Sequence, residues 1–284
     1  MFKDYYQLTK PGIIYANVLT AAAGFLLVST SHIKGWLLLT TLVGTSLVIA
    51  SACVFNNYID RGLDAKMART KRRALVSGRI PVHIALIYAT ILGLAGFAVL
   101  LVWVNWLTAL VGAVAFVDYV IFYGWAKRKS VHGTLVGTVA GAASIVAGYT
   151  AATGLLDREA IILLLILASW QMAHFYAIAI YRLEDYKAAG LPVWPIKRGI
   201  ADTKRYMVGY VLAFIIACFL LTVFNYTGYI FLAVVALVSC YWLVLVLDGL
   251  QTKNNKEWAR QVFLRSLIVI VVLSGALMVG ARLS

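Results

Sequence analysis

Nine long apolar segments dominate this sequence and restrict the folds open to it. Each is close to the roughly 20 residues that a helix needs to cross the hydrocarbon core of a bilayer. Backbone polar groups inside lipid must be paired within their own segment, which favours helices, and the period-two alternation of strands is absent. We therefore predict an all-α, polytopic membrane protein with nine transmembrane helices. The segments cover residues 12–30, 36–58, 82–103, 106–126, 133–153, 160–182, 206–224, 228–247 and 262–281.

The composition agrees with this prediction. Apolar residues make up 63% of the 284 residues and charged residues only 13%, and the mean hydropathy is +0.89. A soluble domain carries charge on about a quarter of its residues, so that class is excluded. The first segment lacks a small-residue cleavage site, and no Arg/Ser-rich transit segment precedes it, which predicts a prokaryotic cell membrane.

The charged residues are divided unevenly between the two sides of the predicted bundle. The formal net charge is +14, from 25 Lys and Arg against 11 Asp and Glu. Nine spans place 22 of these cations on one side, whereas the other side has only Lys34, Arg158 and Arg282. The positive-inside rule then predicts that the N-terminus and the cationic face are cytoplasmic. Because orientation accounts for most of the positive charge, nucleic acid is not expected as a partner.

Acidic residues follow the second apolar segment with helical spacing. Asn56, Asp60 and Asp64 stand at i, i+4 and i+8, which places one amide and two carboxylates along a single helix face. Like charges one turn apart destabilise a helix, so a cation is expected beside them. Hard oxygen ligands suit Mg²⁺, which commonly joins one or two carboxylates to a substrate phosphate. The alternative is a solvated loop edge that carries these acids incidentally.

A basic run comes directly after the acids and contains Arg69, Lys71, Arg72 and Arg73. Taken alone it is typical of a cytoplasmic anchor, and it could also hold anionic lipid head groups. Beside a carboxylate pair that suits Mg²⁺, it can instead clamp a diphosphate, since Arg offers bidentate geometry.

A second polar cluster lies where the sixth segment ends. Asp185 stands about as far past that segment as Asp60 stands past the second one. Two acidic helix ends on one membrane face could hold metal ions from opposite sides. His174, on the same aromatic segment, is open to two interpretations, a hydrogen-bonded packing residue or a member of the site. Two further sets are interpreted as packing residues: the cysteines Cys53, Cys218 and Cys240, and the small-residue ridge Gly133, Gly137 and Gly141.

These residues together resemble the UbiA-type intramembrane prenyltransferases, over roughly residues 8 to 275. The acidic pattern Asn-x-x-x-Asp-x-x-x-Asp is shared across that superfamily, and the segments around Trp170-Gln171-Met172, His174-Phe175 and Asp185-Tyr186 resemble its haem-farnesylating branch. The other matching segments are Leu8-Thr9-Lys10-Pro11-Gly12, Cys53 to Asp60, Arg69 to Arg73, Lys127-Arg128, the Gly137 to Gly148 helix, and Ala189-Gly190-Leu191-Pro192.

The resemblance implies a single UbiA-type domain over residues 1–284, with nine helices around a central cavity and an active site facing the cytoplasm. It implies that a farnesyl group passes from farnesyl diphosphate to a vinyl group of haem b, which gives haem O. Mg²⁺ would be the cofactor, and membrane lipid and a functional link to terminal oxidase assembly are further expected partners. The implied roles are metal ligation by Asp60, Asp64 and Asp185, catalysis by these three with Asn56, diphosphate binding by Arg69, Lys71, Arg72, Arg73, Lys127 and Arg128, and contacts to the organic substrates by His174, Phe175 and Tyr176.

The chain departs from the family pattern at four places, and the two missing proline sites bear on the shape of the acceptor pocket. Ser144-Ile145 replaces a common Pro-Pro pair, Ala173 replaces a Pro, Trp194 replaces Met or Leu, and Asp118 is unlike the pattern. Without the prolines, the two helices are predicted to be straighter. The alternatives are a prenyltransferase of the same fold that acts on an aromatic or quinone precursor, and a transporter of an anionic metabolite. The acids lie at cytoplasmic helix ends rather than at a broken midplane helix, which disfavours transport.

Overall fold

The computed structural model describes residues 2–29 and 33–280, and all regular structure in these ranges is helical. The helices are α1 Phe2–Leu8, α2 Pro11–Leu27, α3 Gly35–Asp64, α4 Val82–Trp103, α5 Trp106–Val117, the π-helical turn η1 Asp118–Phe122, α6 Tyr123–Lys129, α7 Gly133–Thr153, α8 Arg158–Tyr181, α9 Leu183–Ala188, α10 Trp194–Lys197, α11 Ile200–Val223, α12 Tyr229–Asp248 and α13 Asn255–Gly280.

The described residues contain eight helices that are long and apolar enough to cross a membrane, where α5, η1 and α6 count as one. A ninth span results if α1 and α2, bent by 52° at their junction, are taken together. The predicted all-α, nine-span architecture is therefore confirmed. Several helices start or end outside the predicted segments: α3 continues six residues beyond residue 58, and α13 begins at Asn255. The predicted segment ends at residues 30 and 281, and Arg282, lie outside the described residues.

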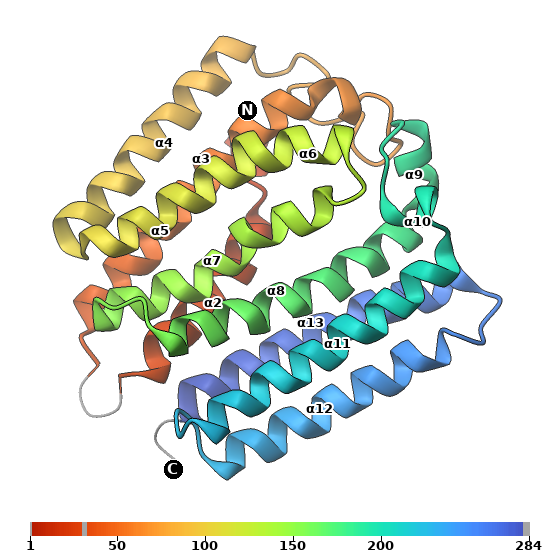
Figure 1. Ribbon diagram of the computed structural model, residues 1–284. Helices are drawn as coiled ribbons and strands as arrows, with labels where there is room; N and C mark the ends of the chain where they lie inside the picture. Colours follow the sequence, from red (N-terminus) through yellow and green to blue (C-terminus); the bar gives the residue numbers. More distant parts are fainter. Residues whose placement is uncertain (1, 30–32, 281–284) are drawn as a thin grey trace.

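The spans form one bundle in which α2 and α8 occupy central positions (Figure 1). α2 packs on α3, α7 and α13, whereas α8 packs on α7, α11 and α13. α4 lies against α3, and α12 lies against α11 and α13. The connections that carry most of the cations, α3–α4, α6–α7, α8–α11 and α12–α13, gather at one end of the bundle, which we call the cationic end.

Glycines set the close approach of α2 to α7. A Cβ at Gly24 would collide with the carbonyl oxygen of Ile145, and one at Gly148 would collide with that of Ala21. The hydroxyls of Thr20 and Ser144 lie 2.7 Å apart between the same helices. The Ser144-Ile145 pair thus sits at a backbone contact, and both α7 and α8 run without a break, as the absence of proline predicts.

The glycine ridge of α7 also packs as predicted. A Cβ at Gly137 would lie 2.7 Å from the ring of Tyr123, and one at Gly141 would overlap the Gln171 side chain. Of the cysteines, Cys53 and Cys218 are buried and all three are free thiols.

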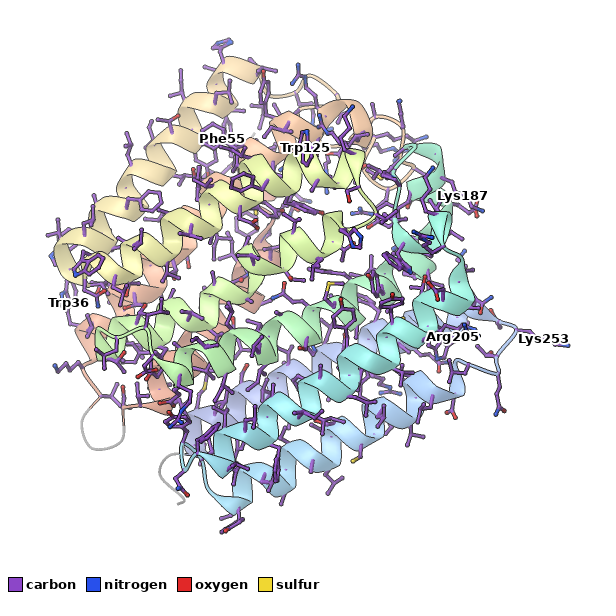
Figure 2. The ribbon with its side chains drawn as sticks, viewed as in Figure 1. Trp36, Phe55, Trp125, Lys187, Arg205 and Lys253 are labelled. Atoms are coloured by element: carbon purple, nitrogen blue, oxygen red, sulfur yellow. The ribbon has the colours of Figure 1, made fainter. Side chains whose placement is uncertain are left out.

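The outer surface of the bundle is apolar. Trp36 and Trp125, labelled in Figure 2, are 65% and 66% exposed. Exposed aliphatic side chains continue along α4, α5, α11 and α12. In a chain with this many spans, such a surface faces lipid rather than water.

Candidate functional site

The C-terminal part of α3 carries the predicted acidic face. Because α3 continues to Asp64, both carboxylates lie on regular helix, and Asn56, Asp60 and Asp64 are all buried. The intervening Arg61 and Gly62 are exposed. The i, i+4, i+8 spacing therefore produces a single inward-facing row of polar side chains.

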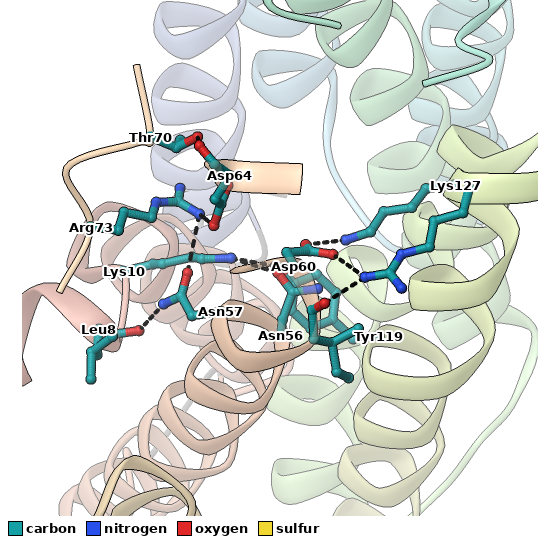
Figure 3. Close-up of polar contacts among 12 residues, drawn as sticks. Leu8, Lys10, Asn56, Asn57, Asp60, Asp64, Thr70, Arg73, Tyr119 and Lys127 are labelled. Carbon is teal, nitrogen blue, oxygen red and sulfur yellow. Dashed lines mark hydrogen bonds and ion pairs between the residues drawn. The ribbon is translucent and has the colours of Figure 1, made fainter. Parts of the chain in front are cut away.

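Both carboxylates are paired with cations from other parts of the chain (Figure 3). Asp60 accepts a hydrogen bond from Nζ of Lys127, and Arg128 lies 3.2 Å from its other oxygen. Asp64 pairs with Arg73 at 2.6 Å. The acids thus occur in fully compensated ion pairs, which explains how two like charges one turn apart can be buried.

The amides of α3 connect the acids to the N-terminal segment. Asn56 accepts a hydrogen bond from Nζ of Lys10 at 2.7 Å. Asn57 donates to the carbonyl of Leu8 at 2.7 Å and accepts from Arg73 at 3.1 Å. The Nδ2 atom of Asn56 is buried and has no hydrogen-bond partner among the described residues. A buried polar atom without a partner is uncommon and is often found where a ligand binds.

The π-helical turn η1 places aromatic rings beside the acids. Asp118 begins the turn and accepts a backbone hydrogen bond from Ala140 of α7 at 3.2 Å. The rings of Tyr119 and Tyr123 stack with their centroids 5.5 Å apart, and Nζ of Lys127 lies 4.7 Å from the centre of the Tyr123 ring. π-Helical turns occur frequently at functional sites because they change which side chains share a face.

The predicted diphosphate clamp is only partly assembled around the acids. Arg73 reaches Asp64, whereas Arg69, Lys71 and Arg72 are exposed. The turn that brings Arg73 inward is fixed by Thr70, whose hydroxyl donates to the carbonyl of Asp64 at 2.9 Å. With Lys127 and Arg128, three of the six predicted cations contact the carboxylates.

Comparison with known proteins agrees with this geometry. The model of the UbiA prenyltransferase family matches residues 17–268. The chain belongs to the UbiA prenyltransferase family. It is accordingly a prenyltransferase and a multi-pass membrane protein.

Known relatives are similar over nearly the whole chain. The protoheme IX farnesyltransferase of Yersinia pseudotuberculosis is 50% identical over 275 residues, which cover 96% of this chain and 93% of the relative. A solved structure of a digeranylgeranylglyceryl phosphate synthase matches with a TM-score of 0.82 at 21% identity, over 100% of this chain and 99% of that one. A UbiA homologue from Archaeoglobus fulgidus bound to GPP and Mg²⁺ matches with a TM-score of 0.66 at 17% identity, over 96% and 99% of the two chains. At these identities the two structures show that the fold is the same.

Asp185 lies beside the loop that follows α3. It is on α9, and it accepts a hydrogen bond from the backbone N–H of Ala68 at 3.2 Å. Met67 packs there against the segment after α9. Burial raises the pKa of the neighbouring Tyr186, and the positive charge of Arg69 opposes that rise. Within the described ranges, no three His, Cys, Asp or Glu side chains are grouped closely enough to hold a metal, so ligation by Asp185 stays a prediction.

His174 contacts α13 rather than the acidic row. Its Nδ1 lies 2.6 Å from the hydroxyl of Ser266, and its ring stacks on Trp170 at 4.8 Å. Phe175 contacts the His174 ring edge-on. Tyr176 is buried against α11. These contacts are those of packing residues. The roles of His174, Phe175 and Tyr176 in substrate binding stay predictions.

Four residues at the site, Lys10, Asn57, Tyr119 and Tyr123, are not among those predicted from the sequence. The sequence did contain an indication for Lys10, because Lys10-Pro11-Gly12 belongs to one of the segments that resemble the family. For Tyr119 and Tyr123 the signal was the adjacent Asp118, a carboxylate in an apolar segment.

Proposed function

We propose that this enzyme transfers the farnesyl group of farnesyl diphosphate to a vinyl group of haem b and so forms haem O. The allylic C–O bond breaks with its electron pair on the diphosphate. A vinyl carbon of haem then forms the new C–C bond, and water adds its hydroxyl to the other vinyl carbon with loss of a proton. The similarity to a protoheme IX farnesyltransferase along nearly the whole chain supports the choice of substrates. The observation that carries the chemistry is the buried row Asn56, Asp60 and Asp64 faced by cations.

The acidic row fits a divalent cation with hard ligands. Two carboxylates and one amide oxygen share a helix face, and these oxygen donors are the ones that Mg²⁺ prefers. Asp60 and Asp64 would hold the ion, with Asn56 beside them and Asp185 approaching from the α9 side. When bound, Mg²⁺ supplies positive charge that stabilises the departing diphosphate.

The cations would bind the diphosphate itself. Arg73, Lys127 and Arg128 already point into the acidic row, where their N–H groups can also donate to phosphate oxygens. Arg69, Lys71 and Arg72 are exposed on the adjoining loop and can guide the charged substrate toward the site.

The aromatic residues would shield the allylic cation. The stacked rings of Tyr119 and Tyr123 lie beside the acidic row, and their faces attract positive charge. Phe175 and Tyr176 would contribute in the same way from α8. His174 would contact or steer the haem.

We further propose that residues 1–284 form one domain in a prokaryotic cell membrane, with the N-terminus and the cationic end in the cytoplasm. The gathering of the cationic connections at one end of the bundle supports this orientation. We also propose a functional link to terminal oxidase assembly, in which the oxidases use the product of this enzyme.

The direct test is product identification. Membranes that contain the protein are incubated with farnesyl diphosphate, Mg²⁺ and haem b, and haem O is sought by mass. A chain with Asp60 and Asp64 both replaced by Asn serves as the matched control. Turnover of an aromatic acid without haem O would replace this proposal by a prenyltransferase acting on a quinone precursor.

A further inference from the structure

A polar cavity lies at the cationic end, formed by elements other than those that carry the acidic row. Its volume is about 660 Å³, and it lies between the first turn of α11 and the loop from α12 to α13. Three cations line it, Lys204, Arg205 and Lys253, and none of the described lining residues is a carboxylate. Figure 2 shows Arg205 on α11 and Lys253 on the α12–α13 loop, both at this end of the bundle.

Lys204 is the central residue of this cavity. Lys204 is only 5% exposed. Its Nζ donates a hydrogen bond to the carbonyl of Thr252 at 3.2 Å. The ring of Trp258 lies 5.2 Å from the same nitrogen. Among the described residues, no carboxylate lies within ion-pair distance of Lys204. An ammonium has three donors, so this one retains hydrogen-bonding capacity and an uncompensated charge.

The polar surroundings favour an anion. α11 is 24 residues long, and no side chain caps its first turn, so its free N–H groups are available at Ile200 and Ala201. Asn255 also lines the cavity, and its Oδ1 is a buried acceptor without a partner among the described residues. A phosphate satisfies the cations and the N–H groups.

One edge of the cavity, at Leu250, is apolar and joins the lipid-facing surface. Leu250 lines the cavity and is 48% exposed. Leu247 and Val244, one and two turns earlier along α12, are also exposed. A molecule whose phosphate lies beside Lys204 can therefore place its acyl chains along α12 without leaving the membrane interface.

We propose that this cavity binds the phosphate head group of an anionic phospholipid, at a site separate from the acidic row of α3. Basic pockets between transmembrane helices on the cytoplasmic side are a known form of lipid recognition. The bound lipid joins α11 to the α12–α13 loop through Lys204, Arg205 and Lys253, and so stabilises the C-terminal part of the bundle.

The test uses the full chain, purified in detergent and depleted of lipid. Phosphatidylglycerol, phosphatidylcholine or inorganic phosphate is added, binding is followed by native mass spectrometry, and the melting temperature is recorded. The test variant is Arg205→Gln/Lys253→Gln, in which both residues are exposed, so that folding is retained. The matched control is Lys256→Gln/Arg260→Gln, which removes the same charge from exposed positions of α13 that do not line the cavity.

We expect phosphatidylglycerol to bind and to raise the melting temperature of the wild type and of the control, whereas its affinity for the test variant falls by about tenfold or more, as the loss of a charge-assisted contact predicts. Lys204→Arg should keep binding and Lys204→Gln should lose it. Equal binding of phosphatidylglycerol to the test and control variants would overturn the proposal. So would equal stabilisation by phosphatidylcholine, or by inorganic phosphate alone.

Discussion

Replacement of Lys127 by Gln tests whether the cations of the acidic row compete with the metal. In the structure, Lys127 donates to Asp60, and both side chains are largely buried, with 13% and 12% exposed. A divalent ion that binds Asp60 must therefore approach an ammonium group closely. Lys127→Gln removes the charge, shortens the side chain by one atom and keeps an N–H donor at its end.

The magnitude follows from the repulsion that is removed. A divalent ion and an ammonium about 5 Å apart repel by roughly 1.7 kcal/mol in water and roughly 7 kcal/mol at an effective dielectric constant of about 20. The value in water is the lower limit for a site that is mostly shielded from solvent. Since about 1.4 kcal/mol is a factor of ten in affinity, the variant should bind Mg²⁺ at least about tenfold more tightly than the wild type when diphosphate is absent.

The same substitution should weaken the binding of the substrate. A charge-assisted hydrogen bond contributes about 1.5 to 3 kcal/mol, so the affinity for pyrophosphate in the presence of Mg²⁺ should fall by about ten- to a hundredfold. The two opposite changes distinguish competition from a general loss of structure.

Isothermal titration of detergent-purified protein measures both affinities, with Mg²⁺ alone and with pyrophosphate at fixed Mg²⁺. Lys129→Gln is the matched control, because Lys129 is exposed on the same helix and contacts neither acid. If Lys127→Gln leaves Mg²⁺ affinity unchanged or lowers it while pyrophosphate is absent, the ammonium does not compete with the metal, and the reasoning fails.

The remaining predictions concern other parts of the molecule. Asp60→Asn and Asp64→Asn should each lower turnover at least about a hundredfold through loss of metal ligation, with normal yield of folded protein; activity retained in both would remove the metal assignment. Gly148→Ala should lower the melting temperature, because overpacking costs about 1–3 kcal/mol and its Cβ would meet the backbone of α2, whereas Gly209→Ala, with open space around it, should not. His174→Ala should raise the KM for the acceptor more than that for the prenyl diphosphate, and Ser266→Ala, which removes the same hydrogen bond, should not; an unchanged acceptor KM would refute the role of His174 in acceptor binding.

The spans and the acidic face could be predicted from sequence because both depend on local patterns. Hydropathy over about 20 residues identifies a span wherever it occurs, and the spacing of Asn56, Asp60 and Asp64 fixes their common face on any helix. The end of α3 was placed too early, since hydropathy falls at the polar residues although the helix continues to Asp64.

The partners of the acids could not be predicted in the same way. Arg69, Lys71, Arg72 and Arg73 are nearly equivalent in sequence, and only the turn held by Thr70 brings Arg73 to Asp64. Lys10 and Asn56 are 46 residues apart in sequence. Their contact depends on how α2 packs against α3, which no local pattern encodes.

The position of Lys10 shows how backbone geometry and site chemistry are connected. Lys10 has a φ angle of 53°, which is uncommon for a residue other than glycine. The following Pro11 disfavours the right-handed helical conformation at Lys10 and begins α2. The bend of 52° between α1 and α2 occurs here, and it lets Lys10 reach Asn56 while the carbonyl of Leu8 accepts from Asn57.

The balance of charge around the acidic row predicts which ligand can enter first. Among the described side chains at this row, Arg73, Lys127 and Arg128 pair with Asp60 and Asp64, and Lys10 binds Asn56 beside them. The row therefore has a surplus of two positive charges. A free Mg²⁺ ion is repelled by this surplus, whereas a prenyl diphosphate, with roughly three negative charges, is attracted to it. A complex of Mg²⁺ with the diphosphate carries a net negative charge and also offers the carboxylates a cation. The site should therefore bind metal and diphosphate with strong positive coupling, because each ligand compensates the charge that opposes the other.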